Sequence, residues 1–158
     1  MRGLWLLLVL LSGCTLTFQP GGLRVTYRLD LEPVIYRFEP DRGPGGVYYV
    51  GEEVRFLLTL ARPGYLALVA VDPDGRTYEF DRVYLPAGTH LLPNRPVRYT
   101  LTPPRGLYRV RAVYTEAPAP ARVRLEGVYT DWDARVRVYL EASGGRLYDL
   151  AETYFYLR

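Results

Sequence analysis

Residues able to act as a nucleophile or a base are few in this chain of 158 residues. Both groups are normally drawn from serine, cysteine and histidine, held within hydrogen-bond reach of each other. His90 is the only histidine, Cys14 is the only cysteine, and Ser143 is the only serine after Cys14. One histidine and one thiol are also too few ligands for a zinc site. The sequence therefore predicts no enzyme, no catalytic residue, no metal site and no cofactor.

Acidic side chains are densest between residues 72 and 81, at Asp72, Asp74, Glu79 and Asp81. The Asp-x-Asp-Gly order is similar to the start of a calcium-binding EF-hand loop, but the third ligand and the closing glutamate are missing. Strand alternation would turn Glu79 and Asp81 towards solvent, on the face opposite Tyr78 and Phe80. A hairpin turn with a charged outer face explains these residues, and no spacing selects a carboxylate pair for glycoside hydrolysis.

Cys14 is the residue for which the sequence indicates a reaction. Arg2 precedes an apolar run, residues 4–11, that is too short to cross a bilayer as a helix. Leu11-Ser12-Gly13-Cys14 follows, and it resembles the lipobox of bacterial lipoproteins, in which the enzyme that cuts before the cysteine needs small residues at the two preceding positions. A lone thiol cannot form an internal disulfide, whereas lipidation would use it. An ordinary signal peptide with an incidental cysteine is the alternative.

The lipobox resemblance implies a division of the chain into three parts. Residues 1–13 would be a lipoprotein signal peptide, residues 14–22 the lipidated cysteine and a short tether, and residues 23–158 a single domain. The lipid on Cys14 would attach the protein to a membrane of the cell envelope. Thr15 is not aspartate, and the resemblance to the sorting pattern of diderm lipoproteins favours the outer membrane or the cell surface.

Arginine supplies all 20 basic residues, yet the net charge is only +3. Four arginines alternate with apolar residues on predicted strands: Arg109, Arg111, Arg122 and Arg124. Guanidinium groups beside tyrosine rings could bind an anionic envelope polymer or an envelope protein. Ordinary strands with a wet outer face would show the same pattern without a ligand. The small charge gives no indication of nucleic-acid binding, and the use of arginine suits ion-pair networks in a thermophile.

Alternating apolar residues predict an antiparallel β protein. The pattern indicates strands at 23–31, 34–38, 54–60, 66–71, 78–80, 97–101, 108–114, 123–125 and 148–157. Residues 66–71 are apolar on both faces, which is typical of a central strand. Tight turns at 62–64 and 72–75 predict a positive φ for at least one of Gly64 and Gly75. We expect an immunoglobulin-like β-sandwich of about 7–9 antiparallel strands.

Residues 130–145 fit two structures. As a strand, Val136, Val138 and Leu140 would share one face. As a helix, Thr130 or Asp131 would cap the start and Gly144 would close the end. The helix would also bury an apolar stripe, Trp132, Val136, Tyr139 and Leu140, and pair Asp133, Arg137 and Glu141 along its surface. We favour a short helix near 131–143, because the strand requires both caps to be coincidental.

Short motifs at strand starts and turns recur along the chain: Val50-Gly51-Glu52, Pro63-Gly64-Tyr65-Leu66, Val71-Asp72-Pro73-Asp74-Gly75, Leu92-Pro93-Asn94, Pro103-Pro104-Arg105-Gly106 and Asp149-Leu150-Ala151-Glu152-Thr153-Tyr154-Phe155-Tyr156. Together they resemble the bacterial family catalogued as domain of unknown function 4384, over about residues 46–157. The resemblance implies a fold and an envelope or surface-layer setting. It implies no catalytic residue, because its motifs consist of residues that form turns and strand starts.

Two functions from different classes are compatible with the sequence. The first is a lipid-anchored, non-catalytic binding or structural module of the cell envelope or surface layer. The second is a cell-wall glycan-active enzyme that uses carboxylates. A closed sandwich argues for the first, and a deep groove holding two inward-facing carboxylates would argue for the second. We expect the first, with its binding surface on an exposed sheet face or on end loops rather than in a pocket.

Overall fold

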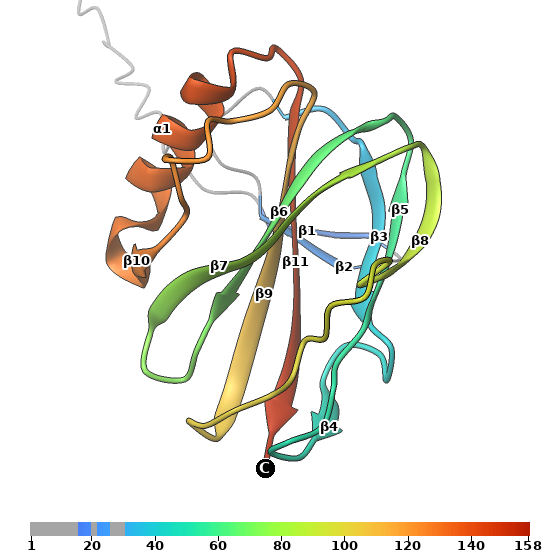
Figure 1. Ribbon diagram of the computed structural model, residues 1–158, viewed down its shortest axis with the longest axis vertical. Helices are drawn as coiled ribbons and strands as arrows, with labels where there is room; N and C mark the ends of the chain where they lie inside the picture. The colour runs from blue at the N-terminus through green and yellow to red at the C-terminus, as the bar shows by residue number, and fades with distance from the viewer. Residues whose placement is uncertain (1–15, 20–21, 26–30) are drawn as a thin grey trace, which may run out of the picture.

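The computed structural model describes residues 16–19, 22–25 and 31–158. Cys14 and the predicted signal peptide lie outside the described residues, as do parts of the predicted tether. The described part contains eleven strands, one 3-10 helix and one α-helix (Figure 1). They are β1 (Leu16–Gln19), β2 (Gly22–Val25), β3 (Ile35–Pro40), β4 (Gly46–Tyr48), β5 (Phe56–Leu60), β6 (Gly64–Val71), β7 (Arg76–Leu85), β8 (Gly88–Leu92), β9 (Gly106–Thr115), β10 (Gly127–Val128), η1 (Tyr129–Asp131), α1 (Trp132–Ser143) and β11 (Tyr148–Leu157).

Seven strands of five or more residues form a β-sandwich, which confirms the predicted mainly β fold. The smaller sheet has the order β3-β5-β8, and the centre of the larger sheet has the order β11-β9-β6-β7. All pairings among these seven strands are antiparallel. In chain order the seven strands are β3, β5, β6, β7, β8, β9 and β11. The first, second and fifth of them form the smaller sheet, and the third, fourth, sixth and seventh form the centre of the larger sheet. This is the immunoglobulin arrangement with its fourth strand moved to the opposite sheet.

Short strands extend the larger sheet at its edges. β10 pairs with β7, and β1 pairs with β2, which contacts β11 through the pair Glu152 and Leu23. β4 runs parallel to β11. Residues 16–19 of the predicted tether are thus the first strand of a hairpin.

Tyr108 occupies the position of the tyrosine corner that many immunoglobulin-like domains have. It lies near the start of β9, and its hydroxyl donates to the carbonyl oxygens of Thr102 at 3.1 Å and Pro104 at 2.8 Å. Its ring stacks on Phe155 of the neighbouring strand β11, with 5.2 Å between ring centroids. The residue fixes the path of the loop that leads into β9.

Two glycines permit the predicted turns for different reasons. Gly75 has a φ of 81°, which confirms the expectation of a positive φ in at least one of the two turns. Gly64 has no positive φ, but a Cβ there would lie 2.3 Å from the ring of Tyr114. The Tyr114 hydroxyl donates to the carbonyl oxygen of Pro63 at 2.7 Å. Gly64 is therefore required by close packing of a tyrosine ring on the backbone.

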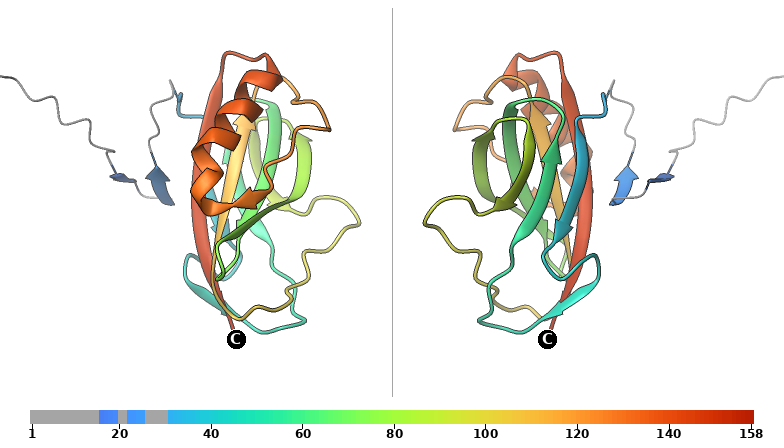
Figure 2. Two further views of the ribbon diagram at one scale, coloured as in Figure 1. Left: turned by 90° about the vertical axis from the view of Figure 1, so that its left-hand side faces the viewer. Right: turned by 90° about the vertical axis from the view of Figure 1, so that its right-hand side faces the viewer.

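Helix α1 confirms the favoured structure for residues 131–143. Gly144 ends it with a φ of 69°, and the predicted apolar stripe is buried. Asp131 is the N-cap residue, one of the two predicted, but its side chain makes no hydrogen bond to the helix. Figure 2, in its left-hand view, shows α1 lying across the outer face of the larger sheet. The fold therefore has three layers: helix, larger sheet and smaller sheet.

A hydrophobic core fills each of the two spaces between these layers. The main core lies between the sheets and includes Phe38, Phe56, Leu58, Leu66 and Phe155. The second lies between α1 and the larger sheet and includes Val69, Val113, Leu125, Trp132 and Val136. The second core explains why β6 is buried on both faces, as its uninterrupted apolar sequence predicts. No described helix is both long enough and apolar enough to cross a membrane.

Four local predictions are wrong. Residues 97–101 and 123–125 are loops, apart from an isolated bridge between Glu53 and Thr100. β8 (Gly88–Leu92) lies between the predicted strands 78–80 and 97–101, where the sequence predicts no strand. Asp81 lies on the same face of β7 as Phe80, the face towards the smaller sheet. The reason is that the β6–β7 pairing shifts by one residue between Leu68 and Val69. Glu79 and Asp81 are both buried rather than exposed.

Candidate functional site

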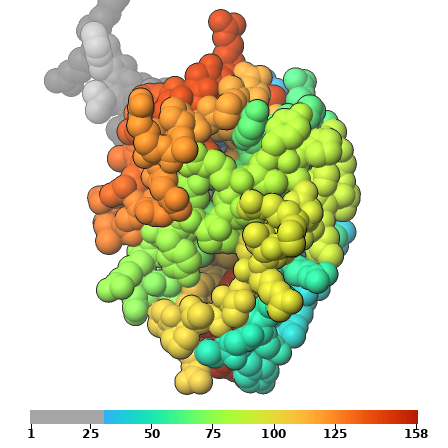
Figure 3. Space-filling model, viewed as in Figure 1, coloured from blue at the N-terminus to red at the C-terminus, as the bar shows by residue number. Residues whose placement is uncertain are grey.

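An aromatic cavity of about 190 Å³ lies between the two sheets. Figure 3 shows it as a hollow in the surface between β7 and the segment 93–105. The smaller sheet ends at β8, which is not paired with β7, so the segment 93–105 crosses the space between the sheets. The lining residues are Val54, Phe56, Ala70, Tyr78, Phe80, Arg98, Tyr99, Thr100, Leu101, Thr102, Tyr108, Val110 and Phe155.

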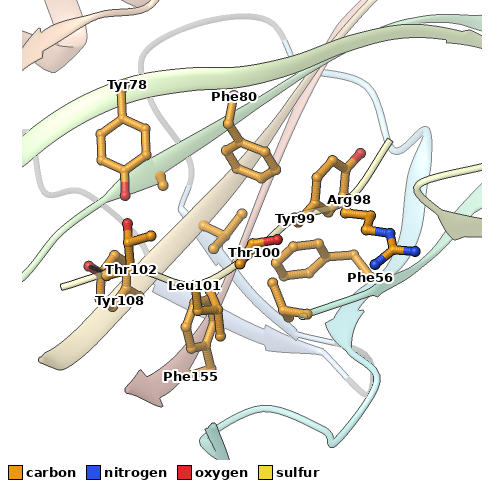
Figure 4. Close-up of a pocket in the computed structure, with 13 residues that line it drawn as sticks. Phe56, Tyr78, Phe80, Arg98, Tyr99, Thr100, Leu101, Thr102, Tyr108 and Phe155 are labelled. Atoms are coloured by element: carbon orange, nitrogen blue, oxygen red, sulfur yellow. Dashed lines mark hydrogen bonds between the residues drawn. The ribbon is translucent and has the colours of Figure 1, made fainter. Parts of the chain in front are cut away.

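Three rings from separate segments form one wall of the cavity (Figure 4). Phe56 comes from β5, Phe80 from β7 and Tyr99 from the segment 93–105. The centroid of Phe56 lies 6.2 Å from each of the other two rings. Phe80 and Tyr99 are 5.0 Å apart and meet edge to face at 80°. Such contacts hold the rings in place without filling the space in front of them.

Asp81 fixes the orientation of Tyr99. The Tyr99 hydroxyl donates to one carboxylate oxygen of Asp81, and the Arg95 guanidinium contacts the other. Burial raises the pKa of Tyr99 to about 12, although Arg95 acts in the opposite direction. Tyr99 thus remains a neutral donor at physiological pH, and its ring separates the apolar cavity from the charged groups behind it.

Polar groups gather at the mouth of the cavity. Tyr78 is 39% exposed, and the side chain of Arg98 is 79% exposed. Figure 4 shows the Tyr78 hydroxyl pointing towards Thr102 and Tyr108, while Arg98 lies at the opposite side beside Tyr99. Burial raises the pKa of Tyr78 and that of Tyr108. The site therefore offers an apolar interior with neutral hydroxyls at one side and a cation at the other.

Glu79 and Asp81 are two buried carboxylates that line a neighbouring cleft of about 340 Å³. Arg82 binds both oxygens of Glu79, at 2.6 and 3.0 Å, and the Leu125 amide adds a third donor at 3.0 Å. Asp81 accepts from Tyr99, Arg95 and the Arg82 amide. The Asp81–Arg95 ion pair joins β7 to the segment 93–105, whereas the Glu79–Arg82 ion pair lies within β7 and Glu79 reaches the loop before β10 through the Leu125 amide.

Arg111, one of the four predicted binding arginines, lies inside the protein at 4% exposure. Its Nε donates to Glu152 at 2.6 Å. Its guanidinium lies 4.4 Å from the ring of Trp132 and 4.8 Å from the ring of Tyr129. The expectation of an exposed Arg111 is wrong, because α1 and η1 cover this part of the sheet. Arg111 instead attaches the helix layer to β9.

The other three predicted arginines are exposed but not gathered. Arg109 lies on β9, with its guanidinium 5.8 Å from the ring of Tyr129. Arg122 and Arg124 lie in the loop that precedes β10. Arg124 pairs with Glu126 at 2.9 Å and donates to the backbone of Glu79 at 3.0 Å. The structure therefore places the predicted set in two regions rather than on one exposed face.

Sequence patterns give almost no indication of the cavity. Alternation correctly turns Phe56, Tyr78, Phe80 and Tyr99 inwards, but it treats them all as ordinary core. The space between them depends on the path of the segment 93–105, which no periodicity describes.

Part of the chain is similar to a known protein family. Residues 47–118 match the family model Domain of unknown function (DUF4384). No curated protein and no solved structure matches the chain. The match confirms the family resemblance over a shorter range than expected, and it leaves out the closing strand β11. Every residue that lines the cavity, except Phe155, lies within the matched range.

Proposed function

We propose that this protein is a non-catalytic binding module of the bacterial cell envelope, held at a membrane by a lipid on Cys14. The aromatic cavity is the observation that carries the proposal. Protein interiors are normally packed without voids larger than a water molecule. At about 24 cal/mol per Å³, a sealed void of about 190 Å³ would cost roughly 5 kcal/mol. A cavity open at the surface is explained better by an occupant than by imperfect packing.

The chemistry of the lining supports binding rather than reaction. Its polar groups are hydroxyls of tyrosine and threonine and one guanidinium. In the described residues that line it, no acid or base stands beside a nucleophile. Rigid rings with hydroxyls at the mouth are typical of sites that orient an apolar group.

Membrane anchoring would make a weak site sufficient. The lipobox resemblance places the lipid on Cys14, and we propose an outer-membrane or cell-surface location for the mature protein. A module tethered there meets other envelope components at a high effective concentration, so a modest affinity is enough.

Two measurements on the native protein test the anchor. Intact-mass analysis should show a mature chain that starts at Cys14 and carries acyl groups, and Cys14→Ser should release the protein into the soluble fraction. A mature chain that starts elsewhere, or has no added acyl mass, would contradict the anchor.

Affinity purification after chemical crosslinking tests the binding function. The wild-type protein should carry envelope components with it, and Ala70→Leu should lose them, because the added carbons fill the cavity. Ala61→Leu adds the same atoms at an exposed position outside the cavity and should leave the result unchanged. Turnover of an envelope glycan by purified protein, abolished by Glu79→Gln, would replace binding by the carboxylate enzyme.

A further inference from the structure

A second depression continues from the aromatic cavity. We call it the arginine groove; it has a volume of about 440 Å³ and is lined by Glu53, Val54, Arg55, Pro93, Arg95, Pro96, Val97, Arg98 and Tyr99. Val54, Arg98 and Tyr99 line both spaces. A ligand group in the cavity would therefore have the rest of its molecule directed along the groove.

The arginine groove contains more positive than negative charge. Three guanidinium groups line it, against the single carboxylate of Glu53. Arg98 pairs with Glu53 at 3.2 Å, but both side chains are exposed, and such pairs contribute little. Arg95 contacts Asp81, whereas Arg55 forms no ion pair with any other described residue. The groove therefore has guanidinium donors available for a carboxylate.

The size of the aromatic cavity limits what can enter it. Pockets for small organic ligands usually measure about 300–1,000 Å³. The cavity, at about 190 Å³, is smaller and fits one large apolar side chain. Interfaces between proteins commonly depend on such an anchor, a single aromatic residue buried in a pocket of the partner. The arginine groove would then hold the residues on either side of the anchor.

We propose that the aromatic cavity and the arginine groove together bind an acidic peptide segment of an envelope protein. An aromatic side chain of the segment enters the cavity in front of Phe56, Phe80 and Tyr99, and a neighbouring carboxylate is bound by Arg98 and Arg55. The inference rests on the proposed binding function and names its partner. Charge complementarity selects an acidic segment, and cavity size selects an aromatic anchor.

Titration with three short peptides tests the inference. The full chain is held in nanodiscs of neutral phosphatidylcholine, and affinities are measured by saturation-transfer NMR. The probes are acetylated and amidated Asp-Phe-Glu, Asn-Phe-Gln and Asp-Ala-Glu. Asp-Phe-Glu should bind at least tenfold more tightly than Asp-Ala-Glu, which lacks the anchor. It should also bind severalfold more tightly than Asn-Phe-Gln, and only this second advantage should shrink at high salt.

Variants of the protein assign the two parts of the site. Arg98→Gln should reduce the affinity for Asp-Phe-Glu towards that for Asn-Phe-Gln, with Arg55 retaining part of the difference, and Ala70→Leu should abolish binding of both. Arg137→Gln removes an exposed arginine from α1, remote from the groove, and should change neither affinity. A circular-dichroism melt of each variant shows whether it is folded, and Arg98→Lys should recover part of the lost affinity in a folded protein.

Several outcomes would overturn the inference. One is the absence of binding by Asp-Phe-Glu. Another is equal affinity for the free acid 3-phenylpropionate, which would make the site one for small aromatic acids. Self-association that Ala70→Leu abolishes would make the occupant a second copy of this chain. If Asp-Phe-Glu does not bind but the wild-type protein still forms crosslinks that Ala70→Leu abolishes, only the acidic segment is refuted. If neither the peptide binding nor these crosslinks are observed, the proposed binding function is refuted as well.

Discussion

Asp149 should be one of the residues on which the stability of this fold most depends. It is 1% exposed and begins β11, next to the first residues of β3. Its Oδ2 accepts hydrogen bonds from the amides of Val34 at 2.8 Å and Ile35 at 2.7 Å. Its Oδ1 accepts from the Leu150 amide at 2.9 Å. One carboxylate therefore joins the edge of the smaller sheet to the larger sheet.

The magnitude follows from the buried amides. Val34 and Ile35 are 1% and 4% exposed, so water cannot easily replace the carboxylate. Each buried donor that loses its acceptor costs about 1–3 kcal/mol. Asp149→Ala should therefore lower the free energy of unfolding by about 2–5 kcal/mol, a large part of the ~5–15 kcal/mol of a typical domain. Asp149→Asn keeps one acceptor oxygen and should cost about 1–2 kcal/mol.

Urea denaturation followed by circular dichroism measures these differences. The midpoint should fall in the order wild type, Asp149→Asn, Asp149→Ala, with little change in the slope. Asp133→Asn changes an exposed carboxylate on α1 and serves as the control, with an expected effect below about 0.5 kcal/mol. An Asp149→Ala variant within about 1 kcal/mol of wild type would refute the reasoning, because the amides would then be satisfied without the carboxylate.

Three further predictions concern packing and ionisation. Gly64→Ala should destabilise by about 2–3 kcal/mol through collision with the Tyr114 ring, and Gly75→Ala by only about 1 kcal/mol through its positive φ. The reverse order in urea melts would contradict this. Tyr99 has a folded pKa of about 12 against an ordinary value of 10.0, so the stability it contributes is present below pH 10 and lost as the pH rises from 10 to 12. Tyr99→Phe should make the alkaline loss of stability shallower, and an unchanged pH profile would contradict the assignment. Trp132→Ala should cost about 3–5 kcal/mol by detaching α1, whereas Val138→Ala, at a 56% exposed position of the same helix, should cost little. Equal effects would show that the helix does not depend on its buried face.

Period-two alternation predicts the strands that have one buried face. Val54, Phe56, Leu58 and Leu60 alternate in the sequence and are all buried. Alternation fails at the edges of the fold. β8 buries only Leu92, so it has no apolar pattern to detect. Residues 97–101 do alternate, but their backbone bonds to residues 51–54 form only one isolated bridge rather than a strand ladder.

The location of the site depends on contacts that local patterns do not describe. Arg111 has the spacing of an exposed strand residue, yet it is covered by a helix that begins at Trp132. Asp81 turns inwards because of one shifted pair in the β6–β7 ladder. Alternation therefore predicts exposure of single arginines and acids correctly only where no later segment packs over the sheet. The cavity depends on the same long-range packing.

Photo-crosslinking from the mouth of the cavity is the most direct test of the binding function. Benzoylphenylalanine replaces Tyr78, which is 39% exposed at the mouth, or Tyr36, which is 58% exposed on β3. After irradiation of the native envelope, the Tyr78 position should give a discrete crosslinked product that Ala70→Leu abolishes, and the Tyr36 position should give none. Crosslinks of equal yield at both positions, or none at Tyr78, would contradict a binding site in the aromatic cavity.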